Sequence, residues 1–418
     1  MNFKERYKAV MKQQRIYPAV HISSKAERAV KGGHPWVYGE EITSEDADIR
    51  DGCIVDVFAG NAWQGSGFYN SNSKIRVRLI SRNSNDSFED AFWKRRIRYC
   101  VDYRKQVMPG DDFRCCRIVH GEADQMPGLT VDRYEDILSV EITCLGMEQV
   151  RPAVYKALKE VFAEEGITVR GIYERNELAL REKEGLPLYK GWYEDGSALP
   201  DSAIVRITEN GIRYFVDVEN GQKTGFFLDQ KYNRAAAARI AEGRNVLDCF
   251  THTGSFGLNC AAAGALKVTS VDISQQAVDM AKQNAEDNGL SGRMEFVCED
   301  VFELLTRLSE EKSRAYDYII LEPPAFTKSR QTVDHAERGY KEINYRAMKL
   351  LPRGGYLATC SCSHFMKDDL FRKMLRSAAY DAGVQLRQIE ARQQAPDHPI
   401  LWNVPETDYL KFYIFQVV

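Results

Sequence analysis

From Asn245 onward the sequence alternates between short apolar segments and helical segments, and no other feature restricts the fold as strongly. Each apolar segment runs into a glycine-bearing or polar turn, which leads into a helix, and the unit repeats several times. This alternation is typical of a parallel β-sheet with helices on both faces. We therefore predict that residues 201–418 form an α/β domain with a doubly wound, Rossmann-like sheet.

Acidic residues stand at the ends of the first three predicted strands. The strands 246–247, 268–271 and 294–298 lead into Asp248, Asp272 and Glu299-Asp300, respectively. Because ligands bind outside the carboxyl ends of strands in such sheets, Asp272 is placed to accept both ribose hydroxyls of a nucleoside-containing cofactor. A carboxylate of Glu299 or Asp300 can accept a hydrogen bond from an adenine amino group.

The turn after the first strand separates two classes of cofactor. A nicotinamide dinucleotide needs a G-x-G-x-x-G turn, which brings its pyrophosphate against a helix N-terminus. The turn 250–255 of this sequence contains one glycine, Gly254, and makes no room for a pyrophosphate. A methionine-type sulfonium cofactor has no pyrophosphate, and Asp248 suits its positive end. The turn therefore favours S-adenosylmethionine over a dinucleotide.

The ends of the fourth and fifth strands carry residues suited to chemistry on a base. Glu322-Pro323-Pro324-Ala325-Phe326 predicts a rigid loop that holds a carboxylate and an aromatic ring near the cofactor. The fifth strand, 356–359, runs into Cys360-Ser361-Cys362, and a thiolate can add to C6 of a pyrimidine and make C5 nucleophilic. The alternatives are a Pro-Pro pair that only ends a strand, and cysteines that serve as small buried hydrophobic residues.

The first 82 residues predict a small β-barrel preceded by a basic N-terminal helix. Short strands separated by Gly, Asn and Ser clusters are expected at 19–22, 52–58, 65–69 and 75–80. In the last of these strands, Ile75, Val77 and Leu79 share one face, which leaves Arg76 and Arg78 on the other. The strand is therefore predicted to have a basic outer face that can contact RNA.

Residues 83–200 predict a central α+β domain. Ser87 stands three residues before Asp90 and indicates a helix start, and Arg95 and Arg98 follow among aromatic residues. Basic and aromatic residues in alternation suit phosphate contact and base stacking. A surface helix whose aromatic side chains face the core explains the same pattern. Further along, a strand is expected at 137–142 and a helix at 150–163.

Bulk composition sets the cellular context that the sequence predicts. The 418 residues include ten cysteines without metal-ligand spacing, which we interpret as reduced thiols of a cytoplasmic protein without a metal site. No segment approaches eighteen consecutive apolar residues, so no membrane partner is predicted. The net charge of −3 neither favours nor excludes nucleic acid, because a mildly acidic protein can still carry a local basic face.

Several motifs together resemble one family over nearly the whole chain. They are Gly33–Tyr38, Gly121–Asp124, Pro127–Tyr134, Gly221–Gln230, Asp248–Phe250, Thr253–Phe256, Pro323–Phe326 and Ser361–Ser363. The sequence resembles the PUA-domain-containing class I ribosomal RNA methyltransferases, which form 5-methylcytosine in large-subunit rRNA. The resemblance implies a PUA-like barrel at 1–82, a methyltransferase domain at 201–418, and S-adenosylmethionine as the cofactor.

The resemblance also implies roles for individual residues. Cys362 would be the nucleophile, whereas the older Thr-Cys-Ser pattern of RNA 5-methylcytosine enzymes selects Cys360. Glu322 stands where the family usually has aspartate, and that acid would contact N3 of the cytosine. The segment 221–230 would close over the cofactor. The residues expected to contact the cofactor are Lys223, Thr224, Phe227, Asp248, Phe250, Thr253, Gly254, Ser255, Asp272, Ile273, Asp300, Val301 and Glu322.

Two other functions fit the sequence. An enzyme that methylates an amino group of guanine or adenine in RNA would use the acid-Pro-Pro-aromatic loop and need no cysteine. A noncatalytic RNA-binding factor in ribosome assembly would keep the barrel and the basic helix but would not bind S-adenosylmethionine. The expected partner is structured RNA, above all large-subunit rRNA. Charged residues in the barrel suit RNA or the second subunit of a homodimer equally well.

Overall fold

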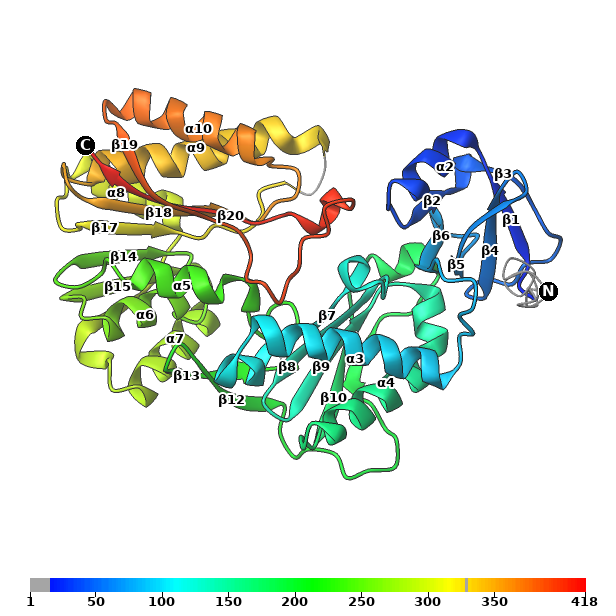
Figure 1. Cartoon of the computed structure of the whole chain (residues 1–418). Coiled ribbons are helices and arrows are strands. Elements are labelled where there is room, and N and C mark those ends of the chain that lie inside the picture. Colours follow the sequence, from blue (N-terminus) through cyan, green and yellow to red (C-terminus); the bar gives the residue numbers. More distant parts are fainter. Residues whose placement is uncertain (1–15, 328–329) are drawn as a thin grey trace, which may run out of the picture. The chain divides into compact units, whose positions relative to one another are not determined.

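The computed structural model describes residues 16–327 and 330–418, which form two compact units (Figure 1). The first unit contains the described residues up to Gln106, together with Arg117–Pro200 and Leu401–Val404. The second contains Val107–Cys116, Asp201–Ile400 and Pro405–Val418. The predicted basic N-terminal helix, with Lys4, Arg6, Lys8, Lys12 and Arg15, lies outside the described residues, and the predicted domain limits at 82 and 200 stay predictions.

A six-stranded sheet in the order β2-β6-β5-β4-β1-β3 begins the first unit. Its apolar core includes Val20, Val37, Val55, Val57 and Val77. The four predicted strands are present, whereas two short strands and helix α2 were not predicted. The elements are β1 (Ala19–Ile22), α2 (Ser24–Lys31), β2 (Trp36–Tyr38), β3 (Ile42–Glu45), β4 (Ile54–Ala59), β5 (Ala62–Tyr69) and β6 (Ile75–Ser81).

The first unit continues with a five-stranded sheet in the order β11-β10-β9-β8-β7. Helix α3 (Asp90–Val107) begins three residues after Ser87, which the sequence indicated as the start, and α4 (Leu145–Glu164) begins five residues before its predicted start and runs through Pro152. The expected strand at 137–142 is β9. The sheet consists of β7 (Cys115–His120), β8 (Leu129–Tyr134), β9 (Ile137–Ile142), β10 (Gly171–Asn176) and β11 (Tyr189–Trp192).

A two-stranded hairpin opens the second unit. Strands β12 (Ile204–Glu209) and β13 (Ile212–Asp217) are joined by Asn210-Gly211, and both turn residues have positive φ, at 53° and 78°. Asn-Gly is the preferred pair for such a two-residue turn, because both positions need the left-handed conformation. Helix α5 (Lys231–Ala238) follows the segment 221–230.

The seven-stranded sheet of the second unit has the order β16-β15-β14-β17-β18-β20-β19. Strands β14 to β18 pair in parallel, which confirms the predicted α/β fold with a doubly wound, Rossmann-like sheet, and β20 is inserted antiparallel between β18 and β19. The strands are β14 (Asn245–Cys249), β15 (Lys267–Asp272), β16 (Met294–Cys298), β17 (Tyr318–Leu321), β18 (Tyr356–Ser361), β19 (Leu386–Arg392) and β20 (Lys411–Val417).

Helices cover both faces of this sheet (Figure 1). Ser274 caps the N-terminus of α7 by accepting a hydrogen bond from the backbone N–H of Ala277, which is a preferred capping interaction of serine. The helix ends before Asn288-Gly289, a pair that is typical of helix C-termini. The helices are α6 (Ser255–Ala262), α7 (Gln275–Asp287), α8 (Val301–Glu310), α9 (Val333–Leu350) and α10 (Asp368–Ala382).

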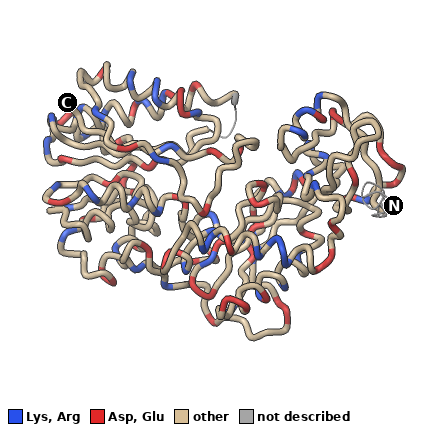
Figure 2. Tube along the Cα trace, viewed as in Figure 1, with Lys and Arg blue, Asp and Glu red and all other residues tan. Residues whose placement is uncertain are grey.

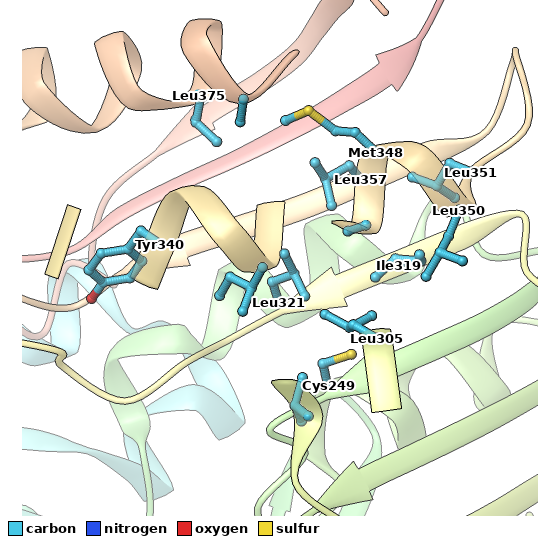
Figure 3. Close-up of a cluster of buried hydrophobic side chains, with 14 of the residues drawn as sticks. Cys249, Leu305, Ile319, Leu321, Tyr340, Met348, Leu350, Leu351, Leu357 and Leu375 are labelled. Carbon is cyan, nitrogen blue, oxygen red and sulfur yellow. The ribbon is translucent and has the colours of Figure 1, made fainter. Parts of the chain in front are cut away.

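The main core of the second unit lies between the sheet and helices α8, α9 and α10 (Figure 3). Leu247, Ile319, Leu321 and Leu357 of the central strands are fully buried there. Burial of each such side chain contributes about 1.5–3 kcal/mol relative to leaving it exposed. A sheet buried on both faces explains why these strands are continuous apolar runs in the sequence.

Lys and Arg are interspersed with Asp and Glu along the traces of both units (Figure 2). Within the described part of the chain, no helix has the length and apolar character needed to cross a membrane.

Candidate active site

Asp248 ends the first strand of the seven-stranded sheet and is fully buried. Its Oδ2 accepts hydrogen bonds from the Thr251 hydroxyl and from the backbone N–H of Gly257, at 2.8 Å for the latter. Within the described part of the chain, Oδ1 has no hydrogen-bond partner although it is buried. Burial raises the pKa of Asp248 to about 6, and the neighbouring Asp272 raises it further. A cationic group of a ligand would satisfy Oδ1 and reverse this shift.

Gly257 gives a first testable prediction, because a Cβ at this position would lie 2.5 Å from Ser270 Oγ and 2.9 Å from Asp248 Oδ2. We expect Gly257→Ala to displace Asp248, to weaken binding of S-adenosylmethionine about tenfold or more, and to cost about 1–3 kcal/mol of stability. Isothermal titration calorimetry and thermal unfolding measure both effects. Gly292→Ala is the control, because no atom lies within 4 Å of its Cβ position. If Gly257→Ala bound S-adenosylmethionine with native affinity, the assignment of Asp248 to the cofactor site would be contradicted.

The turn between β14 and α6 is shaped around Asp272. Asp272 Oδ2 accepts the backbone N–H of His252 at 2.9 Å, and Oδ1 accepts that of Ser274 at 3.0 Å. Phe250, His252 and Gly254 have positive φ values of 62°, 50° and 83°. Left-handed backbone at non-glycine residues is a strained conformation that clusters at ligand sites. Each Asp272 oxygen keeps a lone pair for a ligand hydroxyl.

A small cavity borders this turn. Its volume is about 100 Å³, and its lining includes Gly221, Gly225, His252, Thr253 and Ser274. The predicted cofactor residues Thr253, Gly254 and Ser255 lie in the turn and at the start of α6. The structure therefore brings the strand ends 248 and 272 and the segment 221–230 to the same edge of the sheet.

The end of the third strand separates the two acids that the sequence left open. Glu299 forms an ion pair with Arg307 at 2.8 Å. Asp300 caps α8, and its Oδ1 accepts the backbone N–H groups of Phe302 at 2.7 Å and of Glu303 at 3.2 Å. Only Oδ1 of Asp300 makes these bonds, so this residue is better suited to a ligand amino group than Glu299.

Ile273 and Val301 follow Asp272 and Asp300 directly. The side chain of Ile273 is 69% exposed, which is unusual for an isoleucine and leaves an apolar surface beside Asp272. Val301 is buried at the start of α8.

The segment 221–230 contains three predicted residues, of which Lys223 contacts Asp229. Lys223 Nζ lies 3.1 Å from Asp229 Oδ2 and 4.4 Å from the centre of the Phe227 ring. The Phe227 ring also contacts His252 edge to face at 5.1 Å. Thr224 is buried. The segment is thus connected to the turn of β14 through ring and charge contacts.

Glu322 follows β17, and its side chain is partly exposed. Burial raises the pKa of Glu322 to about 8; Arg234 opposes the shift, and Asp229 and Asp248 add to it. Arg234 itself forms a fully buried, bidentate ion pair with Glu209, with nitrogen–oxygen distances of 2.7 and 2.9 Å. At neutral pH Glu322 is therefore a neutral acid that can donate a proton.

The two candidate cysteines differ in exposure. Cys360 is 1% exposed inside β18, and its sulfur accepts a hydrogen bond from Gln230 Nε2 at 3.5 Å. Cys362 is partly exposed just after β18. Burial raises the pKa of both thiols, and Lys223 counteracts this for Cys362.

Three site residues were not predicted from the sequence. Tyr409 donates its hydroxyl to Asp229 Oδ2 at 2.7 Å. Lys411 Nζ donates to the carbonyl oxygens of Ser363 at 2.6 Å and Tyr409 at 2.8 Å. Gln230 contacts Cys360, as described above. Tyr409 and Lys411 lie in a loop and at the start of an apolar strand that have no local motif, whereas Gln230 ends the 221–230 motif but was assigned no role.

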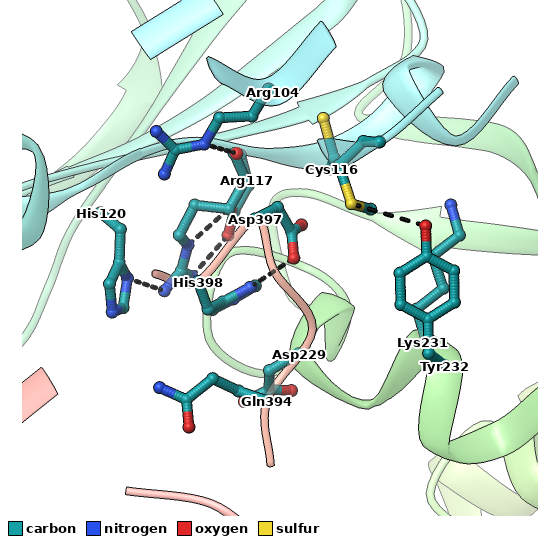
Figure 4. Close-up of polar contacts among 12 residues, drawn as sticks. Arg104, Cys116, Arg117, His120, Asp229, Lys231, Tyr232, Gln394, Asp397 and His398 are labelled. Atoms are coloured by element: carbon teal, nitrogen blue, oxygen red, sulfur yellow. Dashed lines mark hydrogen bonds and ion pairs between the residues drawn. The ribbon is translucent and has the colours of Figure 1, made fainter. Parts of the chain in front are cut away.

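The loop before β20 also carries buried polar residues. His398 Nδ1 lies 2.9 Å from Asp397 Oδ1, and both side chains are buried (Figure 4). At the start of α5, Tyr232 donates its hydroxyl to Asp112 Oδ2 at 2.6 Å.

In the first unit, Arg78 corrects the expected basic outer face of β6. Arg78 is 8% exposed and forms an ion pair with Glu184 at 2.7 Å. Its guanidinium group is therefore buried rather than presented to RNA. Arg76 donates to the carbonyl oxygen of Ser71 at 2.6 Å and lies beside a cavity of about 560 Å³ that Tyr38 and Lys74 also line.

Helix α3 fits the alternative of a surface helix with its aromatic residues toward the core only in part. Phe92 and Trp93 are buried, whereas Tyr99 and Tyr103 are 58% and 38% exposed. Arg98 forms ion pairs with Glu164 and Glu165, and Arg95 forms one with Asp86 at 2.7 Å. These acids neutralise the predicted RNA-binding arginines of the helix.

Comparison with known proteins identifies the family. A family model described as S-adenosylmethionine-dependent methyltransferase matches residues 192–415, more than half of the chain, and a PUA-like domain model matches residues 20–82. The chain belongs to the S-adenosylmethionine-dependent methyltransferases. S-Adenosylmethionine is accordingly the cofactor of the methyltransferase domain, and the barrel of the first unit is PUA-like.

Relatives align with almost the whole methyltransferase chain. "Ribosomal RNA large subunit methyltransferase I" from Pseudoalteromonas atlantica is 39% identical over 394 residues, which cover 94% of this chain and 97% of that protein. The protein of the same name from Klebsiella pneumoniae is 36% identical over 405 residues, with 96% and 99% covered. A methyltransferase structure complexed with SAH has a TM-score of 0.80 at 22% identity and covers 96% of this chain and 100% of that one.

The residues present fit the cofactor. The buried, unpartnered Oδ1 of Asp248 and the free lone pairs of Asp272 are acceptors for the amino group and the hydroxyls of S-adenosylmethionine. When bound, S-adenosylmethionine supplies an electrophilic methyl group on a sulfonium. Asp248, Asp272 and Asp300 are the acids that would hold it.

Proposed function

We propose that the protein methylates C5 of a cytosine in large-subunit ribosomal RNA, with Cys362 forming a covalent bond to C6 of the base. The observation that carries the proposal is the pair of a partly exposed cysteine, Cys362, and a carboxyl group, Glu322, at neighbouring strand ends of the sheet, where burial raises the pKa of Glu322. Relatives of 36–39% identity named ribosomal RNA large subunit methyltransferase I support the choice of RNA.

In the proposed reaction, the two side chains act on opposite ends of one conjugated system. The Cys362 thiolate forms a bond to C6, and Glu322 gives its proton to N3, so that C5 gains electron density. C5 then takes the methyl group. A base removes the C5 proton, the bond between C6 and sulfur breaks, and the N3 proton returns to the Glu322 carboxylate. Over the cycle the base exchanges its C5 proton for the methyl group, and the positive charge of the sulfonium leaves with that proton.

Cys362 is preferred to Cys360 on exposure and contacts. A nucleophile must reach the base, and Cys360 is enclosed in the strand with its sulfur engaged by Gln230. The charge of Lys223 opposes the rise in the pKa of the Cys362 thiol. A cationic neighbour favours the thiolate, which is the reactive form.

RNA contact is proposed for the groove beside Arg76. Arg76 and Lys74 make no ion pair with any described residue, and Tyr38 offers an aromatic ring in the same groove. Cations without carboxylate partners suit phosphate, and a partly exposed ring such as that of Tyr38 suits base stacking. Arg95 and Arg98 are secondary candidates, because their neighbouring acids compete with phosphate.

Transfer of labelled methyl from S-adenosylmethionine to ribosomal RNA that lacks the modification tests the function. We expect the label in 5-methylcytidine after digestion of the RNA to nucleosides. Label in a methylated guanosine or adenosine would select amino-group methylation and discard the covalent step. Binding of the cofactor without transfer to any ribosomal RNA, naked or in particles, would contradict the proposed substrate.

A further inference from the structure

Lys411 is held beside the turn Ser361–Ser363, which contains Cys362, by the register of two strands. Strands β18 and β20 pair antiparallel, with Ser361 directly opposite Lys411. From this position the lysine side chain extends to Ser363, and its Nζ donates to the Ser363 carbonyl oxygen at 2.6 Å. A second hydrogen bond of 2.8 Å reaches the carbonyl oxygen of Tyr409. The residues on both sides of Cys362 are thus tied to this one lysine.

The turn has further anchors that fix its shape. The hydroxyl of Ser363 donates to the carbonyl oxygen of Thr327 at 3.0 Å, and the backbone N–H of Ser363 donates to Ser361 Oγ at 3.4 Å. With Lys411 at its carbonyl group, Ser363 is held at three points. Loss of the lysine would remove one of these three anchors together with its charge.

No carboxylate neutralises the ammonium group of Lys411. The side chain is 6% exposed, and no carboxylate oxygen of the described chain lies within 4.0 Å of Nζ. Lys231, a second buried lysine of the same unit, is instead neutralised by a carboxylate, because its Nζ lies 2.7 Å from Asp112 Oδ1. An unpaired buried cation is costly, and such a group gains from any anion that forms nearby.

Cys362 is the nearby group that becomes an anion in the proposed function. Several charged side chains act on the two residues. Asp408, Cys362, Lys367 and Asp368 influence Lys411, whereas Lys223, Asp229 and Glu322 influence Cys362. Burial lowers the pKa of Lys411 to about 8, and its interaction with Cys362 acts in the opposite direction. Lys223 is the stronger cation toward Cys362, but Asp229 already neutralises it.

We propose that Lys411 is a positioning residue for Cys362, which holds the Ser361–Ser363 turn through the Ser363 carbonyl and stabilises the thiolate with its otherwise unpaired charge. The inference rests on the proposed function in that it takes Cys362 as the nucleophile. Nζ keeps two N–H groups for the two carbonyl oxygens in either protonation state. The third proton on Nζ is not needed for these hydrogen bonds. It gives the lysine the positive charge that stabilises the thiolate.

Alkylation of Cys362 by iodoacetamide in the full chain tests this role without any RNA. The rate is followed from pH 6 to 10, with the modified cysteine assigned by tandem mass spectrometry of the peptide. We expect Lys411→Met to raise the midpoint of the pH profile by about one unit or more and to lower the rate at pH 7.5 about tenfold. An unchanged midpoint would show a merely structural lysine and overturn the proposal.

Lys231→Met is the matched control, because it removes a buried lysine of the same unit that is paired with Asp112. Its midpoint is expected to stay within about 0.3 units of the native value, and an equal shift in both variants would also overturn the proposal. If thermal unfolding shows that Lys411→Met is not folded, the pH profile of Lys411→Arg is measured instead. A midpoint within about half a unit of the native one supports the proposal, and a rise of about one unit contradicts it. Failure to find 5-methylcytidine would leave these thiol measurements unaffected.

Discussion

Replacing Cys362 with alanine is expected to lower methyl transfer to ribosomal RNA about a thousandfold or more, with the Kd for S-adenosylmethionine within about twofold of the native value. A thousandfold loss corresponds to about 4 kcal/mol of activation free energy. C5 of cytosine is a poor nucleophile until sulfur adds to C6, whereas the acids that hold the cofactor lie on other strands. Single-turnover transfer of labelled methyl and calorimetric cofactor binding measure the two quantities.

Cys360→Ala is the matched control, since it removes a thiol two residues away. Cys360 is buried and contacts Gln230, so its loss is expected to cost stability but less than about tenfold in transfer. A reversed result, with Cys360→Ala inactive and Cys362→Ala active, would move the nucleophile to Cys360. Full activity in the double variant would remove the covalent step and favour methylation of an amino group.

The parallel part of the methyltransferase sheet could be predicted closely from the sequence. Strands buried on both faces are short apolar runs, and β16 agrees with its predicted limits while β14, β15, β17 and β18 differ by at most two residues at either end. Local signals at the strand ends, such as the Ser274 cap of α7, are readable because they involve residues close in sequence. The acids Asp248 and Asp272 were found for the same reason.

Features that depend on distant residues were missed. Strand β20 lies about fifty residues after β18, and the pairing of Ser361 with Lys411 is set by register rather than by any local motif. A lysine that begins an apolar strand gives no sign in the sequence that it reaches Ser363. The β12–β13 hairpin was not predicted either, although Asn210-Gly211 is a local signal for such a turn.

The predicted RNA-binding arginines show the same limit. Alternation placed Arg78 on the outer face of its strand, but Glu184, 106 residues later, pairs with it in the interior. Arg98 is likewise matched by Glu164 and Glu165 of α4. A basic pattern in one segment predicts a basic surface only when no acid from another segment covers it.

Glu322→Gln is expected to lower methyl transfer about a hundredfold at pH 7 and to change how the rate depends on pH above 8. The pKa of Glu322 is raised to about 8, so below this pH the native side chain is protonated and can give a proton to N3. Above it, the protonated fraction of Glu322 falls while the thiolate fraction of Cys362, whose pKa is also raised, still grows, so the native rate should stop rising with pH. In Glu322→Gln the rate should keep rising with the thiolate fraction. Initial rates between pH 6 and 9.5 measure the profile, with cofactor binding at each pH as control.

Stability provides an independent check on the same group, because the carboxyl binds its proton more tightly in the folded state than in the unfolded state. The folded protein therefore holds the extra proton between the ordinary pKa of glutamate and about pH 8, and the free energy of unfolding falls as the pH rises through this range. Glu322→Gln should lack this contribution and be the more stable form above pH 8. Glu322→Asp keeps the acid but shortens it by one methylene, so a larger loss of transfer than of stability would show that the position of the carboxyl group matters. Native activity at pH 7 in Glu322→Gln would exclude proton donation by this residue.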